Sequence, residues 1–152
     1  MTIPVRLPTS KVAGSKGFST YVYPTNIFYC IKGTTSNSGY LWPGTVIASG
    51  TYPDTTTPVA RYRIQQPTIL SGLSATCNSI TGGDSVTITV CKDASGGTLL
   101  SNPTVFTVTL SAGTLSATFY NASVDFNVGQ NINLHIAVSG SVTDLAVQLD
   151  LF

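Results

Sequence analysis

A single histidine limits the chemistry that this chain could perform. Of the 152 residues only His135 is a histidine, so a Ser-His-Asp triad or a histidine-based metal site would have to use it. It shares one predicted strand face with Asn131 and Asn133, which is typical of a histidine at a sheet surface or an interface. The sequence contains no GxSxG, HExxH, P-loop or GxGxxG motif. We therefore expect a protein that is not an enzyme, and an enzyme that uses His135 stays as an alternative.

The acidic residues do not indicate a site either. The chain has no glutamate, and its six acidic residues, all aspartates, show no short spacing that would suggest paired-carboxylate hydrolysis. Most of them fall at predicted turns, where hydrogen bonds from the side chain to the backbone explain them. Asp93 alone supplies too few oxygen ligands for a calcium ion in the loop that follows it. We expect neither a metal nor another cofactor.

The charge of the chain argues against nucleic-acid and membrane partners. Charged residues make up 9% and the formal net charge is +1, whereas about 25% charged residues is usual. Phosphate binding needs several clustered Lys or Arg, and Arg61 with Arg63 is more typical of a solvated edge. The apolar stretches are shorter than the ~18 residues of a membrane helix, and the N-terminus lacks a hydrophobic signal core. We expect a soluble chain that is made in the cytoplasm and does not insert into a membrane.

The three cysteines are expected to be free thiols. Cys30, Cys77 and Cys91 form no CxxC motif, and an odd number cannot pair completely within one chain. A hairpin that turns at residues 81–84 would place Cys77 opposite Ile88, which is out of register for a bridge to Cys91. Free, partly buried thiols fit a reducing compartment.

Alternation of apolar and polar residues predicts an all-β chain. Thr, Ser, Val, Asn and Gly are common, and they favour strands and turns over the interior of a helix. Residues 1–20, rich in Pro, Lys, Gly and Ser, are expected to form an extended arm, and residues 21–152 a single domain. Strands are expected at 21–23, 27–31, 60–65, 69–78, 85–92, 104–110, 115–120, 123–128, 131–138 and 144–152.

The two faces of each predicted strand separate a core from a surface. Apolar sets expected in the core are Val86, Ile88 and Val90, then Phe106, Val108 and Leu110, then Ile132, Leu134, Ile136 and Val138. About ten strands in one domain predict two antiparallel sheets packed as a jelly-roll sandwich. An immunoglobulin-type sandwich is the nearest alternative.

The last predicted strand has two different faces. Leu145, Val147, Leu149 and Leu151 form one aliphatic face, and Ala146, Gln148, Asp150 and Phe152 form a mixed one. Such a strand suits burial against its own sandwich on one side and against a second copy on the other. The polar loops at 33–40 and 50–58 are the segments most exposed to a partner.

Several segments resemble a known family. These are residues 85–90, 128–132 and, most specifically, the ending Asp-Leu-Ala-Val-Gln-Leu-Asp-Leu-Phe at 144–152. Within a region of about sixty per cent of the chain, from Tyr62 onward, they resemble the tumour necrosis factor-like, complement-type globular heads. The versions carried by large DNA viruses and by phage or bacterial surface proteins are the most similar. The collagen-like stalk that often precedes such heads is absent here.

The resemblance implies a ten-stranded jelly roll that assembles as a trimer with its terminal strand near the threefold axis. We expect a virion protein of viral origin that serves particle assembly or host attachment, with other capsid proteins or a host receptor or glycan as partners. The expected trimer interface contains Tyr120, His135, Ala146, Gln148 and Phe152. An alternative is a lectin-like module whose loops hold a sugar through Asn37, Tyr40, Trp42 and Tyr52.

Overall fold

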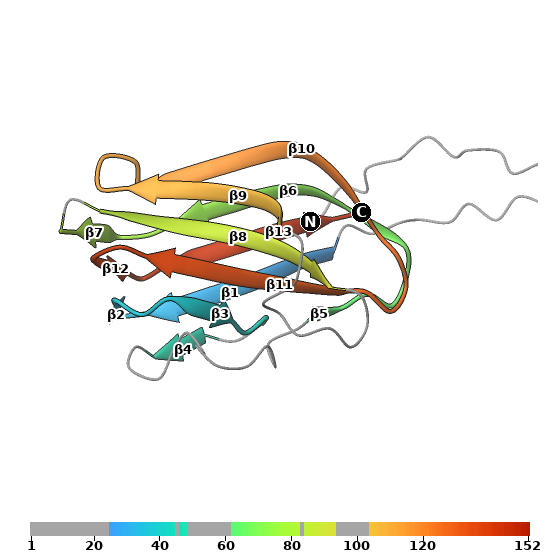
Figure 1. Cartoon of the computed structure of the whole chain (residues 1–152), viewed down its shortest axis with the longest axis horizontal. Coiled ribbons are helices and arrows are strands. Elements are labelled where there is room, and N and C mark those ends of the chain that lie inside the picture. Colours follow the sequence, from blue (N-terminus) through green and yellow to red (C-terminus); the bar gives the residue numbers. More distant parts are fainter. Residues whose placement is uncertain (1–24, 45, 49–61, 83, 94–103) are drawn as a thin grey trace, which may run out of the picture.

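The computed structural model describes residues 25–44, 46–48, 62–82, 84–93 and 104–152, and these form strands and no helix (Figure 1). The predicted arm at 1–20, the predicted strand at 21–23 and the loop at 50–58 lie outside these residues. The strands are β1 (Thr25–Lys32), β2 (Thr34–Thr35), β3 (Gly39–Leu41), β4 (Val46–Ala48), β5 (Tyr62–Arg63), β6 (Thr68–Thr76), β7 (Ser79–Thr81), β8 (Ser85–Asp93), β9 (Thr104–Ser111), β10 (Ser116–Phe126), β11 (Asn131–Val138), β12 (Ser141–Thr143) and β13 (Ala146–Leu151). The prediction of an all-β chain is confirmed.

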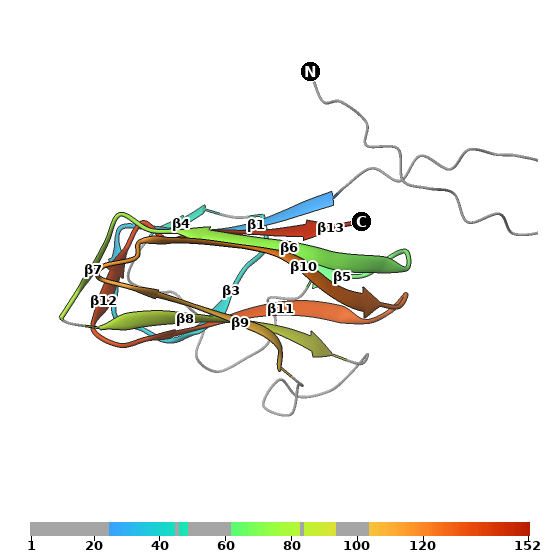
Figure 2. The ribbon, with the colours of Figure 1, turned by 90° about the horizontal axis from the view of Figure 1, so that it is seen from above.

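The strands form two main sheets and a small one. The first sheet has the order β10-β6-β13-β1-β4, and we call it the β13 sheet. The second has the order β3-β11-β8-β9, with β5 also paired to β11, and we call it the β11 sheet. These two sheets lie face to face as two layers, and the small sheet β2-β12-β7 lies at one end of them (Figure 2). Neighbouring strands are antiparallel except β1 and β4, which pair in parallel.

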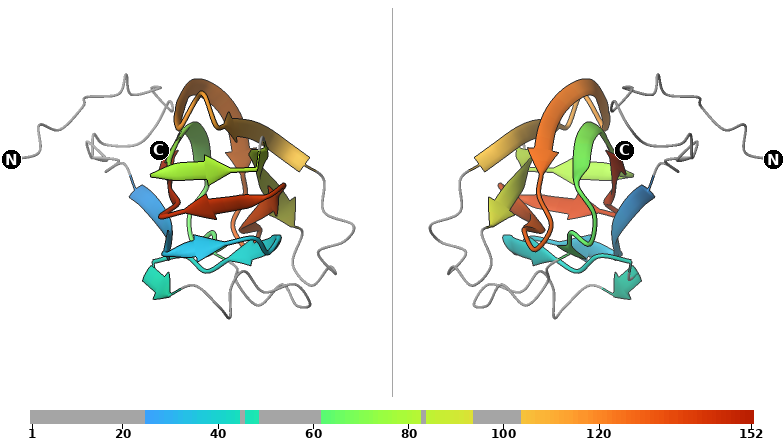
Figure 3. Two further views of the ribbon diagram at one scale, coloured as in Figure 1. Left: turned by 90° about the vertical axis from the view of Figure 1, so that its left-hand side faces the viewer. Right: turned by 90° about the vertical axis from the view of Figure 1, so that its right-hand side faces the viewer.

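The chain passes from one layer to the other at most of its connections. The steps from β5 to β6, from β9 to β10 and from β10 to β11 each change sheet, while β8 and β9 are neighbours in one sheet. The strands β7 and β12 pair with each other at the end of the sandwich, and each leads from one main sheet to the other. The views along the sandwich show both layers end-on (Figure 3). This arrangement is compatible with the predicted jelly roll.

The core lies between the two sheets and contains the predicted apolar sets. Val86, Ile88 and Val90 of β8 and Ile132, Leu134 and Ile136 of β11 are fully buried. Leu110 is also buried, whereas Phe106, Val108 and Val138 are only partly buried at the margin. The ring of Phe106 packs at 4.4 Å against that of Phe119, which closes the edge of the sandwich between β9 and β10. Strand alternation therefore identified the inward face of each of these strands.

The predicted hairpin at residues 81–84 is wrong. The strand before it, β6, belongs to the β13 sheet, and the strand after it, β8, belongs to the β11 sheet. The intervening β7 pairs with β12, so this segment is a crossover between layers and not a reversal within one. Cys77 consequently follows a strand of the β13 sheet, whereas Cys91 belongs to a strand of the β11 sheet. All three cysteines are free, as expected.

Two strands predicted at 115–120 and 123–128 are one strand. The long β10 pairs with β6 on both sides of an irregularity between Tyr120 and Val124. From Tyr120 to Val124 the chain advances four residues on β10, while the partner strand β6 advances only two, from Gly72 to Leu70. Within this segment Ser123 adopts a positive φ of 43°. This bulge absorbs the polar residues that made the sequence suggest a turn. The loop predicted at 33–40 likewise contains β2 and the start of β3.

Candidate self-association face

The last strand separates its side chains as the alternation predicts. Val147, Leu149 and Leu151 of β13 are buried in the core, and Ala146, Gln148 and Asp150 are half-buried on the opposite side. Beyond β13, Phe152 continues the pairing, because its N–H donates to Ile69 O (3.0 Å) and Ile69 N–H donates to Phe152 O (2.7 Å). The C-terminal segment is thus held by the sheet along its whole length, with one face directed away from the sandwich.

Cross-strand pairing shows which residues join Gln148 on that face. Residues paired directly across antiparallel strands project to the same side of a sheet. The outward rows, from β1 through β13 and β6 to β10, are Cys30-Ala146-Thr76-Ser116, Phe28-Gln148-Ser74-Thr118 and Asn26-Asp150-Gly72-Tyr120. We call these rows, with Ile69 and Phe152 beside them, the β13 outer face.

The β13 outer face exposes aromatic side chains, and its carboxylates are Asp150 within the three rows and Asp125, which pairs with Ile69 at one end. Phe28 on β1 is 49% exposed, and Tyr120 on the edge strand β10 is 70% exposed. In the three rows only Asp150 is charged, and its Oδ1 accepts a hydrogen bond of 2.6 Å from Gln148 Nε2. The centre of the face consists of small and uncharged side chains. Exposed aromatic groups around a centre of low charge are typical of a protein–protein interface.

A glycine lets the strands on this face approach closely. Gly72 of β6 is buried between β10 and β13, and a Cβ atom there would lie 2.9 Å from Phe119 O and 3.1 Å from Asp150 Oδ2. The Tyr120 ring lies next to this position, 3.8 Å from the same point. Gly72 therefore fixes where Tyr120 and Asp150 stand on the face.

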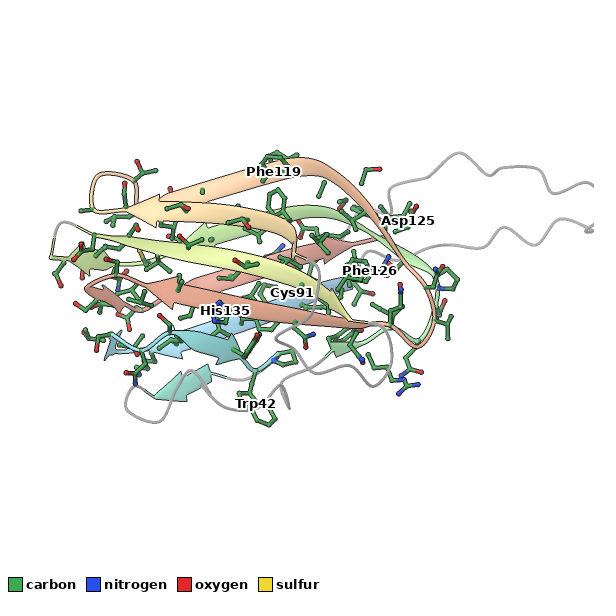
Figure 4. All side chains as sticks on the ribbon, viewed as in Figure 1. Trp42, Cys91, Phe119, Asp125, Phe126 and His135 are labelled. Atoms are coloured by element: carbon green, nitrogen blue, oxygen red, sulfur yellow. The ribbon has the colours of Figure 1, made fainter. Side chains whose placement is uncertain are left out.

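His135 does not lie with the other predicted interface residues. Tyr120, Ala146, Gln148 and Phe152 share the β13 outer face, whereas His135 stands on β11 in the other layer (Figure 4). Its ring contacts that of Tyr40 edge-on, with centroids 4.8 Å apart and an interplanar angle of 66°. Burial lowers the pKa of His135.

The predicted loop residues are only partly available to a ligand. Asn37 is exposed between β2 and β3, Tyr40 is half-buried on β3, and Trp42 is half-buried and packs against the core. Tyr52 lies outside the described residues. Burial is the main cause that raises the pKa of Tyr40, and the negative charge of the Cys91 thiolate is the second. The structure therefore brings together Tyr40 and His135, which the sequence assigned to different sites.

Three residues of interest were not identified from the sequence. Phe28 and Ile69 alternate with core residues, and that alternation was the available signal for their outward position. Asn133 was expected on a surface, yet it is fully buried. The alternation along β11 correctly predicts that Asn133 points away from the core between the sheets. Alternation alone cannot show whether that outer side is covered.

No protein-family model matches the chain. A search of curated proteins finds no relative either. Among the described residues, no helix is long and apolar enough to cross a membrane.

Proposed function

We propose that this chain is a structural or surface protein of a virus, and that it works as a homotrimer in particle assembly or host attachment. The trimer forms through the β13 outer face, in a jelly roll of the tumour necrosis factor-like type. No catalytic step is assigned to it. The outward face around Gln148, which has one charged residue in its three rows and the exposed rings of Phe28 and Tyr120 at its margins, is the observation that carries the proposal.

The strand order supports this fold. The terminal strand β13 is the central strand of its sheet, flanked by β1 and β6, and most connections, though not the one from β8 to β9, lead from one layer to the other. The resemblance of residues 144–152 to the terminal segment of trimeric heads implies a terminal strand near the threefold axis. Four of the five residues expected at that axis, namely Tyr120, Ala146, Gln148 and Phe152, share one face.

The lectin-like alternative has weaker support. Trp42 packs in part against the core and Tyr40 contacts His135, so each ring has only part of its surface available to stack on a sugar. Among Asn37, Tyr40 and Trp42, Asn37 alone is exposed. A glycan array without hits would remove this alternative.

Solution mass tests the assembly. Light scattering on the purified chain is expected to give a mass near three times 15.9 kDa. Tyr120→Glu places a charge at an exposed margin of the face, and we expect it to shift the mass to that of one chain. The matched control is Val128→Glu, since Val128 is 61% exposed on the turn between β10 and β11 and lies outside the face. A wild-type protein that is a monomer at all concentrations would contradict the proposal.

The viral assignment has a separate test. Mass spectrometry of purified particles from the source should detect this chain.

A further inference from the structure

A buried polar cluster lies on the outer side of the β11 sheet, in the layer opposite the self-association face. Asn133 of β11 pairs directly with Cys91 of β8, and His135 is the next residue of β11 on the same side. Tyr40 of β3 pairs with His135 from the other direction. These four residues, from three adjacent strands, we call the Cys91 cluster. Figure 4 marks Cys91 and His135 on their neighbouring strands.

The cluster is closed at its centre and open at one end. Asn133 is 0% exposed and Cys91 is 7% exposed. His135 and Tyr40 are half-buried and their rings are in contact, so the imidazole connects the buried centre to solvent.

The Asn133 carboxamide has no hydrogen-bond partner. Neither Oδ1 nor Nδ2 makes a hydrogen bond, although both atoms are buried. Nearly all buried polar side chains in folded proteins are paired, and an unpaired one lowers stability by the cost of removing it from water. An apolar side chain of similar size would avoid that cost, so a carboxamide held opposite a thiol indicates a polar ligand.

We propose that Cys91, His135 and Asn133 bind a divalent transition-metal ion of the Zn²⁺ class. A thiolate sulfur and an imidazole nitrogen are the ligands that Zn²⁺ prefers, at about 2.3 Å and about 2.0–2.1 Å. Cys91 and His135 are diagonal neighbours on adjacent strands, and such pairs stand roughly 7–8 Å apart, within reach of one ion between them. Asn133 Oδ1 supplies the third ligand, and a water molecule on the His135 side completes four-coordination. On binding, the Cys91 S–H proton leaves to solvent and the sulfur–metal bond forms.

The ligand set also explains why the site does not stand out by residue type. No group of three or more His, Cys, Asp or Glu side chains is placed to hold a metal in the part of the chain that the structure describes. In the Cys91 cluster a carboxamide oxygen takes the place of the third such ligand. We therefore expect micromolar rather than nanomolar affinity, as an order of magnitude.

Titration with Co²⁺ tests the site, because Co²⁺ takes Zn²⁺ positions and a bound thiolate gives it a charge-transfer absorption in the near ultraviolet. Using the full chain after treatment with a chelator, we expect one Co²⁺ per chain with this absorption, and its loss when Zn²⁺ is added. Cys91→Ser should abolish the absorption, and His135→Gln should weaken binding at least tenfold. Cys30→Ser is the matched control, since Cys30 is a half-buried thiol on the β13 outer face, and it should leave the titration unchanged.

Asn133→Leu separates a binding role from a packing role. Without metal, this variant should melt at a higher temperature than the wild type, because it removes an unpaired buried amide. The same variant should bind Co²⁺ at least tenfold more weakly. If Cys91→Ser does not fold, His135→Gln and Asn133→Leu still decide the question. Absence of thiolate absorption in the wild-type protein, or an absorption that depends on Cys30 and not on Cys91, would overturn the proposal; oligomer mass is an independent readout.

Discussion

At the scale of single residues, this protein places several polar groups where ordinary packing does not require them. Asp144 is an example, because it adopts a positive φ of 52° that side chains other than glycine rarely adopt. Its Oδ1 accepts a 2.7 Å hydrogen bond from Gly33 N–H, and its Oδ2 accepts one of 2.7 Å from Asn78 Nδ2. One side chain thus joins the approach to β13 to two distant segments, after β1 and after β6.

Replacement of Asp144 should separate backbone strain from hydrogen bonding. Asp144→Ala loses both bonds and keeps the unfavourable φ, so we expect the free energy of unfolding to fall by about 2–4 kcal/mol. Asp144→Gly loses the same bonds but accepts the positive φ. Its free energy of unfolding should therefore fall by roughly 1 kcal/mol less than that of the alanine variant. Urea denaturation of the two variants and the wild type measures this order. Equal stability of the alanine and glycine variants would show that the φ of Asp144 costs nothing.

At the scale of strands, close packing between neighbours depends on one small residue. Gly72→Ala would place a methyl group 2.9 Å from Phe119 O, a backbone atom that cannot move away freely. We expect this variant to lower the free energy of unfolding by about 1–3 kcal/mol, as overpacking does. Gly113→Ala is the matched control, because nothing lies within 4 Å of a Cβ atom there. Thermal melting of both variants makes the comparison, and an unaffected Gly72→Ala protein would mean that β6 and β10 separate easily.

Strand scale is also where the sequence was most informative and where it failed. Local alternation predicted β8, β11 and the segment that contains β13, with their inward faces, because a period of two depends only on neighbouring residues. It did not predict that β6 and β8 belong to different sheets, since strand partners are set by contacts between distant segments. The bulge between Tyr120 and Val124 was missed for a related reason, because pairing with β6 keeps polar residues in a strand.

The candidate sites show the same division between local and distant information. The sequence placed Ala146 and Gln148 on one face, which alternation determines. It could not show that Phe28 lies beside Gln148, or that Asn133 is buried opposite Cys91, because each pair joins segments far apart in the chain. His135 was grouped with residues of the other layer for want of that information.

At the scale of the whole molecule, the two outer sides of the sandwich differ in character. The β13 outer face exposes Phe28 and Tyr120 around a centre of low charge, which suits association between copies. The β11 sheet instead carries a polar cluster around Asn133 on its outer side. Because the two lie in opposite layers, the proposed self-association would not cover the Cys91 cluster. Assembly and ligand binding can then be altered independently by substitution.

A threefold arrangement makes a specific prediction for the centre of the β13 outer face. Gln148→Glu changes one atom of the side chain and places a second carboxylate beside Asp150. In a trimer built around β13, three such pairs meet near the axis, so we expect dissociation at pH 8 and low salt. Salt should restore the trimer because it screens like charges over about 10 Å at 0.1 M.

Lower pH should restore the same trimer by protonation. Neighbouring carboxylates raise the pKa of each other. In the assembled state the carboxyl introduced by Gln148→Glu is therefore protonated at pH values above the ordinary glutamate pKa of about 4.3. The assembled state then binds more protons than the free chain, and association strengthens as the pH falls toward that value. Thr107→Glu carries the same charge on an exposed position of β9, in the other layer, and should stay trimeric throughout. Light scattering across pH and salt measures both variants, and a Gln148→Glu protein that stays trimeric at pH 8 and low salt would place the axis away from β13.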